Sequence, residues 1–162
     1  LFYAFLGDGE GRFQAVAFYA LVYGLMNLLA FAALPMAAVD AERDRLDNLK
    51  GLYQRAPFAA LMIAVAMFSL AGIPPLPGFV AKFVIFRNVI EAGYTLYAVL
   101  GLVGSYLGIY FYLRVLQYMF MSPAPAGLPQ QGSARLALGA IAVCLVPAVI
   151  LTVYPGGLLG GL

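Results

Sequence analysis

The sequence predicts an all-α integral membrane protein with about five transmembrane helices, one of them discontinuous at a Gly/Pro-rich break. Of its 162 residues, 9 are Lys or Arg and 7 are Asp or Glu, so 10% are charged, against about 25% in a soluble domain. Hydrophobic residues make up 64% of the chain, more than a soluble domain of this size can bury. The apolar runs are continuous rather than alternating with a period of two, which argues against a β-barrel.

The first predicted span covers about residues 13–39. It carries no charge over 27 residues, which is long enough to cross a bilayer with some tilt. The loop 40–56 follows, with four basic and four acidic residues. Their alternating signs predict a solvated surface loop that has room for a short helix at the membrane interface.

The next two segments, about 57–73 and 77–93, are separated by the residues AGIPPLPGF, a density of Gly and Pro that no unbroken helix tolerates. Two arrangements are open: a tight hairpin between two spans, or a break at membrane depth whose freed backbone groups are satisfied by protein or water. Spans at about 95–121 and 134–154 complete a single transmembrane domain over 1–162. The chain starts inside apolar sequence at Leu1 without a basic n-region, so we expect the C-terminal part of a longer subunit.

Composition excludes several classes of function. The chain has no His, and its single Cys144 cannot by itself hold an iron–sulfur cluster or a zinc ion. A net charge of +2 without a basic cluster argues against nucleic-acid binding. We therefore expect no cofactor and no metal in this chain, and the lipid bilayer as its surroundings.

Lys82 is the strongest candidate for chemistry, because it is the only lysine inside a predicted span and follows the helix break. Ionisable residues within spans are costly and commonly line polar paths, and lysine can exchange its proton where arginine stays protonated. Discontinuous helices also place backbone dipoles near mid-membrane ion sites. The alternative is a lysine in the first turn of its helix that extends to the membrane surface.

A second set of candidates forms a possible polar path. Tyr106, Tyr110 and Arg114 recur every four residues and so share one helix face; the alternative is an interfacial arginine within an aromatic belt. Asn27 lies near the middle of the first span, where it could join a hydrated path or make an interhelical hydrogen bond. Glycines at 104 and 108 predict a small-residue face that another helix approaches closely.

Two stretches carry a family resemblance: FSLAGIPPLPGFVAKFVIF (68–86) and GSYLGIYFYLRVLQYMFM (104–121). The pattern G-I-P-P-x-x-G-F-x-x-K-F, followed by Y-L-R-V, resembles the C-terminal half of the antiporter-like membrane subunits of respiratory complex I. Within that family it is most similar to the N-type, because M-type members have a glutamate at the place of Lys82 and L-type members usually continue Lys-Asp.

The resemblance implies the last five of fourteen helices, with Lys82 as the proton-path lysine of the discontinuous one. It implies a proton-translocating subunit without a redox site, in a bacterial inner (plasma) membrane beside the other membrane subunits of complex I. NADH, FMN, iron–sulfur clusters and quinone would belong to other subunits. Two alternatives are a subunit of a multisubunit sodium/proton antiporter and a structural bundle without transport. The basic residues of loop 40–56 favour a cytoplasmic position, whereas the resemblance places the loop outside.

Overall fold

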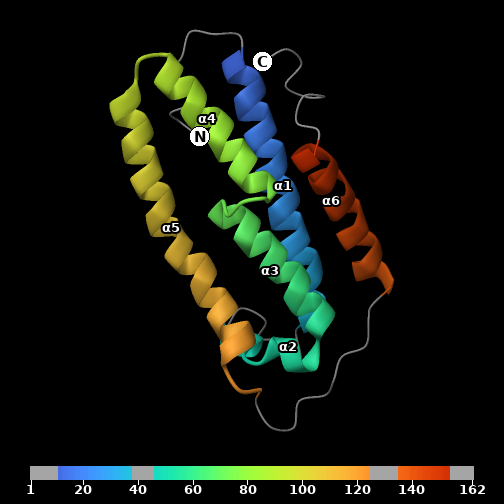
Figure 1. Cartoon of the computed structure of the whole chain (residues 1–162). Helices are drawn as coiled ribbons and strands as arrows, with labels where there is room; N and C mark the ends of the chain where they lie inside the picture. The colour runs from blue at the N-terminus through green and yellow to red at the C-terminus, as the bar shows by residue number, and fades with distance from the viewer. Residues whose placement is uncertain (1–10, 38–45, 125–134, 154–162) are drawn as a thin grey trace.

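The regular structure of the chain is helical in every range that the computed structural model describes, which is 11–37, 46–124 and 135–153 (Figure 1). This confirms the all-helical prediction. The elements are α1 (Gly11–Ala37), a short 3-10 helix η2 (Leu46–Leu49), α2 (Leu52–Arg55), α3 (Pro57–Ala71), α4 (Pro77–Glu91), α5 (Thr95–Met121) and α6 (Arg135–Val153).

The predicted segments correspond to these helices with small shifts at their ends. The segment 95–121 agrees with α5 at both ends, and 57–73 and 77–93 begin where α3 and α4 begin. The loop 40–56 is described from Leu46 onward, where it contains η2 and α2; its first residues lie outside the described ranges.

Helices α1 and α5 are long enough to cross a membrane, whereas α3 and α4 are not. Helices α1 and α5 have 27 residues each, which is about 40 Å at 1.5 Å per residue. Both contain a stretch long and apolar enough to cross a membrane. Helices α3 and α4 have 15 residues each, or about 22 Å, less than the roughly 30 Å of a hydrocarbon core.

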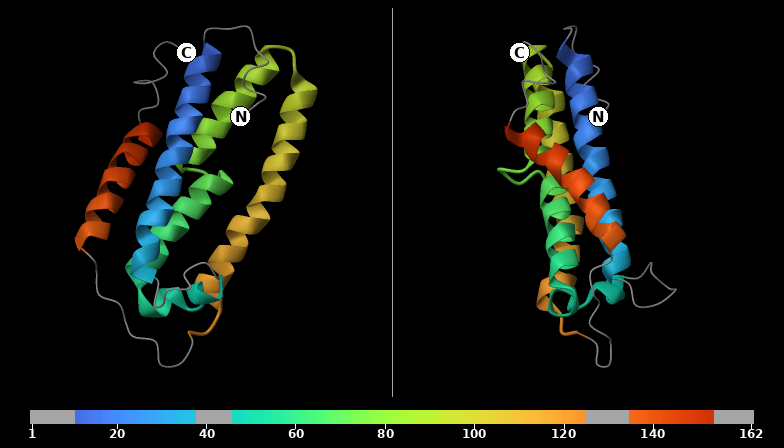
Figure 2. Two further views of the ribbon diagram at one scale, coloured as in Figure 1. Left: turned by 180° about the vertical axis from the view of Figure 1, so that it is seen from behind. Right: turned by 90° about the vertical axis from the view of Figure 1, so that its right-hand side faces the viewer.

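Helices α3 and α4 follow one another nearly end to end, and together they extend along the length of α1 and α5 (Figures 1 and 2). They lie between these two long helices, and α6 packs mainly against α1. The main core forms along α1, against which both α3 and α6 pack; its members include Phe18, Met26, Leu29, Ala60, Ile63, Cys144 and Ala148. Within α5 only Ala98, Leu116 and Met119 are buried, so this helix stands apart from the others over most of its length.

The segment before α3 connects the lower ends of α3 and α5 in Figure 1. Gly51 donates its backbone N–H to the carbonyl of Tyr118 at 3.1 Å. The Arg55 side chain donates to the carbonyl of Asn48 at 2.7 Å, and burial lowers the pKa of this guanidinium. These contacts hold the end of α5 beside the start of α3, which positions the two helices around the break between α3 and α4.

Candidate functional site

The break after α3 begins with a left-handed glycine. Gly72 has φ +87°, and its N–H bonds the carbonyls of Phe68 and Ser69, while the N–H of Ile73 returns to Phe68 at 3.1 Å. This is the hydrogen-bond pattern of a glycine-terminated helix. The carbonyls of the last residues of such a helix have no partner further along it, so those of Leu70 and Ala71 need partners from elsewhere.

The start of α4 lies directly against the end of α3. The backbone N–H of Gly78 donates to Ser69 Oγ at 3.0 Å, in a buried position. A Cβ placed on Gly78 would lie 1.8 Å from the carbonyl oxygen of Ser69, far inside van der Waals contact. Glycine at this position is therefore what lets the two half-helices approach, and the serine hydroxyl satisfies an amide at the start of α4.

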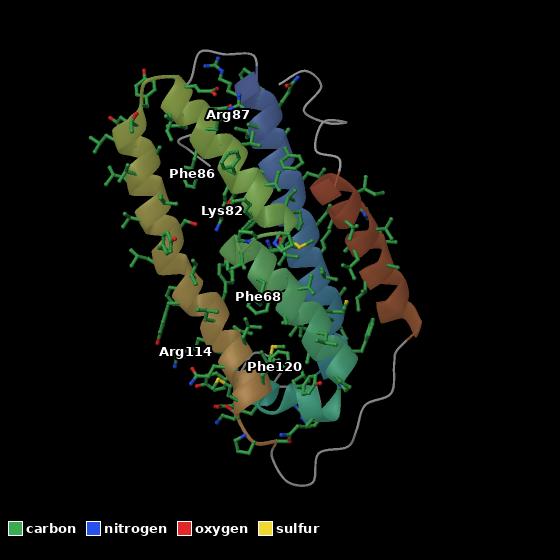
Figure 3. The ribbon with its side chains drawn as sticks, in the orientation of Figure 1. Phe68, Lys82, Phe86, Arg87, Arg114 and Phe120 are labelled. Carbon is green, nitrogen blue, oxygen red and sulfur yellow. The ribbon has the colours of Figure 1, made fainter. Side chains whose placement is uncertain are left out.

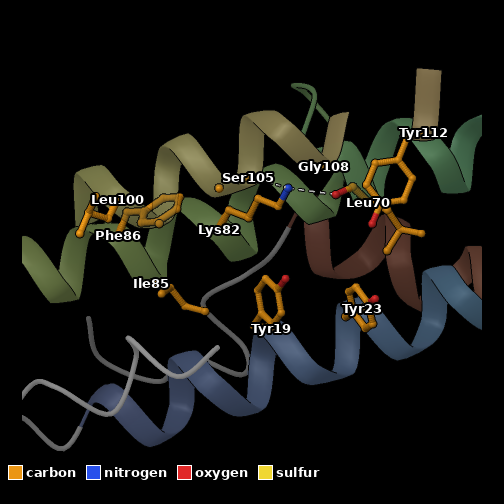
Figure 4. Close-up of a pocket in the computed structure, with 12 residues that line it drawn as sticks. Tyr19, Tyr23, Leu70, Lys82, Ile85, Phe86, Leu100, Ser105, Gly108 and Tyr112 are labelled. Carbon is orange, nitrogen blue, oxygen red and sulfur yellow. Dashed lines mark hydrogen bonds between the residues drawn. The ribbon is translucent and has the colours of Figure 1, made fainter. Parts of the chain in front are cut away.

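Lys82 lies on the face of α4 that looks into this break. Its Nζ donates to the carbonyl oxygen of Leu70 at 3.0 Å and to Ser105 Oγ at 2.9 Å (Figure 4). It also donates to the carbonyl oxygen of Ala71 at 2.9 Å. An ammonium has three N–H donors, and each meets an acceptor here. Two of them are the carbonyls at the C-terminus of α3, the negative end of the helix dipole. The side chain is thus bonded inside the break instead of extending to the end of α4.

Two cavities with room for water adjoin the lysine, beside a third space of only about 10 Å³. The larger measures about 430 Å³ and lies between α1, α4 and α5; its polar lining includes Tyr19, Tyr23, Tyr112 and Ser105. The smaller, of about 210 Å³, lies between the break, α4 and α5, and its lining is mostly apolar with Tyr106 as a polar member. Both volumes have room for several waters, so the lysine has polar space beside it within the bundle.

The predicted polar path is only partly brought to this site. Tyr106 lines the smaller cavity together with Lys82, although 65% of its surface is exposed. Tyr110 and Arg114 line neither cavity. Arg114 instead has Tyr110 and Tyr118 of its own helix as its electrostatic neighbours, and Figure 3 shows it well down α5 from Lys82. Spacing by four residues placed these side chains on one face, but that face turns progressively away from the lysine.

Asn27 also makes a local contact. Its Nδ2 donates to the carbonyl of Tyr23 at 2.7 Å, one turn earlier in α1. The interhelical bond considered from the sequence is not the one that forms, and Asn27 lines neither of the cavities at Lys82.

Several residues of the site were missed as site residues by sequence reasoning: Tyr19, Tyr23, Tyr112 and Ser105. A Cβ at Gly104 or Gly108 would meet nothing within 4 Å, so no described helix packs against the glycine face, contrary to expectation. Gly104 and Gly108 line the larger cavity instead. The cavity-lining face of α5 is visible in the sequence, because positions 101, 104, 105, 108 and 112 share one helix face. The same spacing is equally typical of a face on which another helix packs.

Within the described ranges no group of three or more His, Cys, Asp or Glu side chains could hold a metal ion. Among the residues that the structure describes, no carboxylate lines either cavity at Lys82. Among the described residues, the polar groups at the site are therefore one ammonium, backbone carbonyls and hydroxyl groups.

Comparison with known proteins shows the family to which the chain belongs. Residues 1–108 match the family model described as NADH:quinone oxidoreductase/Mrp antiporter, TM. NADH-quinone oxidoreductase subunit N of Geobacter metallireducens is 39% identical over 156 residues, 96% of this chain and 33% of the relative. The subunit N of Chloroflexus aggregans is 42% identical over 166 residues, 96% of this chain and 34% of the relative.

A solved structure shows the same fold. It is respiratory complex I from Thermus thermophilus with bound aureothin, matched with a TM-score of 0.77 and 34% identity over 98% of this chain and 36% of that chain. The chain thus spans about a third of the length of the curated relatives cited above.

Proposed function

Because the chain belongs to the NADH:quinone oxidoreductase/Mrp antiporter transmembrane family, and within it to subunit N, we propose that it translocates protons through Lys82. It would do so as part of a respiratory complex I in a bacterial plasma membrane, next to other membrane subunits. Oxidation of NADH and reduction of quinone, with FMN and iron–sulfur clusters, would take place in other subunits.

The observation that carries this proposal is the set of acceptors around Lys82. A charged side chain inside an apolar bundle is costly unless it is paired or solvated. Here the end of α3 supplies two carbonyls and α5 supplies a hydroxyl, all within 3.0 Å of Nζ. The break therefore supports an ammonium within the bundle, and the adjoining cavities offer water as the other partner of a proton transfer.

We also propose that α3 and α4 make one interrupted crossing of the membrane. Each half is too short to cross alone, and together they match α1 and α5 in length (Figure 2). The chain then forms a single transmembrane domain with four crossings instead of the five expected from the sequence, and the break lies at membrane depth. The loop at Leu46–Arg55 and the end of α5 share one side, as the Gly51–Tyr118 hydrogen bond requires.

The decisive experiment replaces Lys82 in the full-length subunit of an assembled complex. Inverted membrane vesicles are given NADH, and the protons pumped are measured per NADH oxidised. We expect Lys82→Met to lower this ratio severalfold, and Lys82→Arg to lower it too, since arginine retains its proton. Lys50→Met is the control, because this exposed lysine lies outside the long helices. A normal ratio in an assembled Lys82→Met complex contradicts the proposal.

Sodium is the competing cation, because the matching family model also covers Mrp antiporters. Among the described residues no carboxylate lines either cavity, and the ammonium of Lys82 repels a cation such as Na⁺, which favours protons. Replacing sodium with choline in the vesicle assay separates the two: unchanged pumping supports protons, and a collapse that sodium restores supports antiport.

A further inference from the structure

The two cavities beside Lys82 share three residues of their linings. Lys82, Phe86 and Ser105 each border both the larger and the smaller cavity. Lys82 and Phe86 stand one turn apart on α4, and Ser105 faces them from α5 (Figure 4). These three side chains therefore form the wall between the two spaces.

The wall separates surroundings of different character. The larger cavity carries the hydroxyls of Tyr19, Tyr23 and Tyr112. The smaller cavity is bordered mainly by apolar side chains, among them Phe79 and Phe83. If water connected the two spaces around the lysine, protons would pass without using Lys82, and any proton gradient would dissipate. An apolar ring in the wall opposes such a connection, because it gives water no hydrogen-bond partner.

Ser105 supplies the polar part of the wall besides the lysine. Its Oγ lies 2.9 Å from Lys82 Nζ, and it is the acceptor that ties the lysine to α5, since the other two belong to α3. Glycines at 104 and 108 leave open space on the same helix, so no neighbouring side chain on that face takes the place of this hydroxyl. A hydroxyl that accepts from the lysine also keeps one donor for a water in either cavity.

We propose that Phe86 and Ser105 form a partition across the proton path: Ser105 is a positioning residue that holds Lys82 Nζ between the cavities, and Phe86 keeps their waters from joining around it. The inference rests on the proposed function of Lys82 as the proton carrier. It adds a requirement of its own, which is that the path is closed to passive protons at Phe86.

The partition is tested first by passive leak. A pH gradient is imposed on vesicles that hold the assembled complex, without NADH, and its decay is followed. We expect Phe86→Ala and Phe86→Val to speed the decay severalfold while NADH oxidation continues, and Phe86→Leu to resemble the unaltered protein. Phe111→Ala is the control, because this ring is 68% exposed on α5 and borders neither cavity.

The positioning role is tested by two substitutions of equal shape. Threonine and valine differ by a hydroxyl in place of a methyl group, so Ser105→Thr retains the acceptor and Ser105→Val removes it. We expect protons pumped per NADH to stay near normal in the first and to fall severalfold in the second. Rescue by threonine is what separates positioning from a general effect of volume.

The outcomes are distinguishable from failure of the proposed function. If Lys82→Met abolishes pumping but the Phe86 variants leak no more than the control, the partition is wrong and the proton role of Lys82 stands. If Ser105→Val and Ser105→Thr behave alike, the positioning role is wrong. If Lys82→Met pumps normally, the proposed function fails, whatever the leak.

Discussion

Lys82 and Arg114 are both cations within long apolar sequence, yet the structure treats them differently. The partners of Lys82 come from two other elements, the end of α3 and the middle of α5. The electrostatic neighbours of Arg114 are tyrosines one turn away on the same helix, and this residue is exposed. A charge in an apolar helix can thus be satisfied inside the bundle where groups from other elements converge on it. Where only its own helix supplies partners, it can be satisfied at a surface.

The largest expected effect comes from placing a side chain in the close contact between α3 and α4, beside Lys82. Gly78→Ala places a Cβ 1.8 Å from the Ser69 carbonyl oxygen, so α3 and α4 must separate. We expect a loss of about 1–3 kcal/mol or more in stability, as for other overpacked sites, seen as a lower thermal midpoint of the purified complex. Gly24→Ala is the matched control, because its Cβ meets nothing within 4 Å. Equal midpoints for the two variants would contradict this account of the break.

Substituting Gly72 and Gly93 distinguishes the effect of backbone strain from the effect of a contact with Lys82. Gly72 and Gly93 both have positive φ, +87° and +83°, but a Cβ on Gly72 lies 2.9 Å from Lys82 Cδ and one on Gly93 meets nothing. We expect Gly72→Ala and Gly93→Ala to lose similar stability, about 1–2 kcal/mol from the left-handed conformation. Only Gly72→Ala should also lower protons pumped per NADH. Equal pumping in both variants would show that the lysine tolerates displacement.

Removing the other cation, Arg114, should have little effect on proton pumping. Arg114 borders neither cavity, so Arg114→Met should leave protons pumped per NADH within experimental scatter of the unaltered complex, in contrast to Lys82→Met. A loss as large as that of Lys82→Met would place Arg114 on the proton path and remove the distinction drawn here.

The smallest effect is expected in the loop before α3. Asp47 pairs with Lys50 at 2.7 Å, and its hydrogen bond raises the pKa of this exposed lysine. A raised pKa stabilises the fold below the unfolded value, about 10.4, and this contribution is lost only as the pH rises through the folded value. Asp47→Asn should therefore barely change the thermal midpoint, and equally so at every pH from about 6 to 9, since exposed pairs contribute little. A marked drop within that range would show that the pair is structural.

The sequence by itself determined the helical character of the chain, both ends of α5, and the interruption between Ala71 and Pro77. These follow from local causes: continuous hydropathy for the helices, and glycines and prolines that cannot continue one. Lys82 could be singled out for the same reason, because a lone lysine beside such an interruption is visible in one dimension. The resemblance to antiporter-like subunits also rests on contiguous motifs, and the relatives confirm it.

Only the tertiary structure decided what surrounds that lysine. It set the end-to-end placement of α3 and α4, and it brought the tyrosines of the larger cavity to the lysine. It also formed the bond from Lys82 to Ser105, which lies 23 positions away. The same glycine spacing on α5 is compatible with a packed helix or an open cavity, and only the position of α1 and α4 relative to α5 selects the cavity. Distant contacts of this kind depend on how helices are placed relative to one another, which hydropathy and spacing along one helix do not encode.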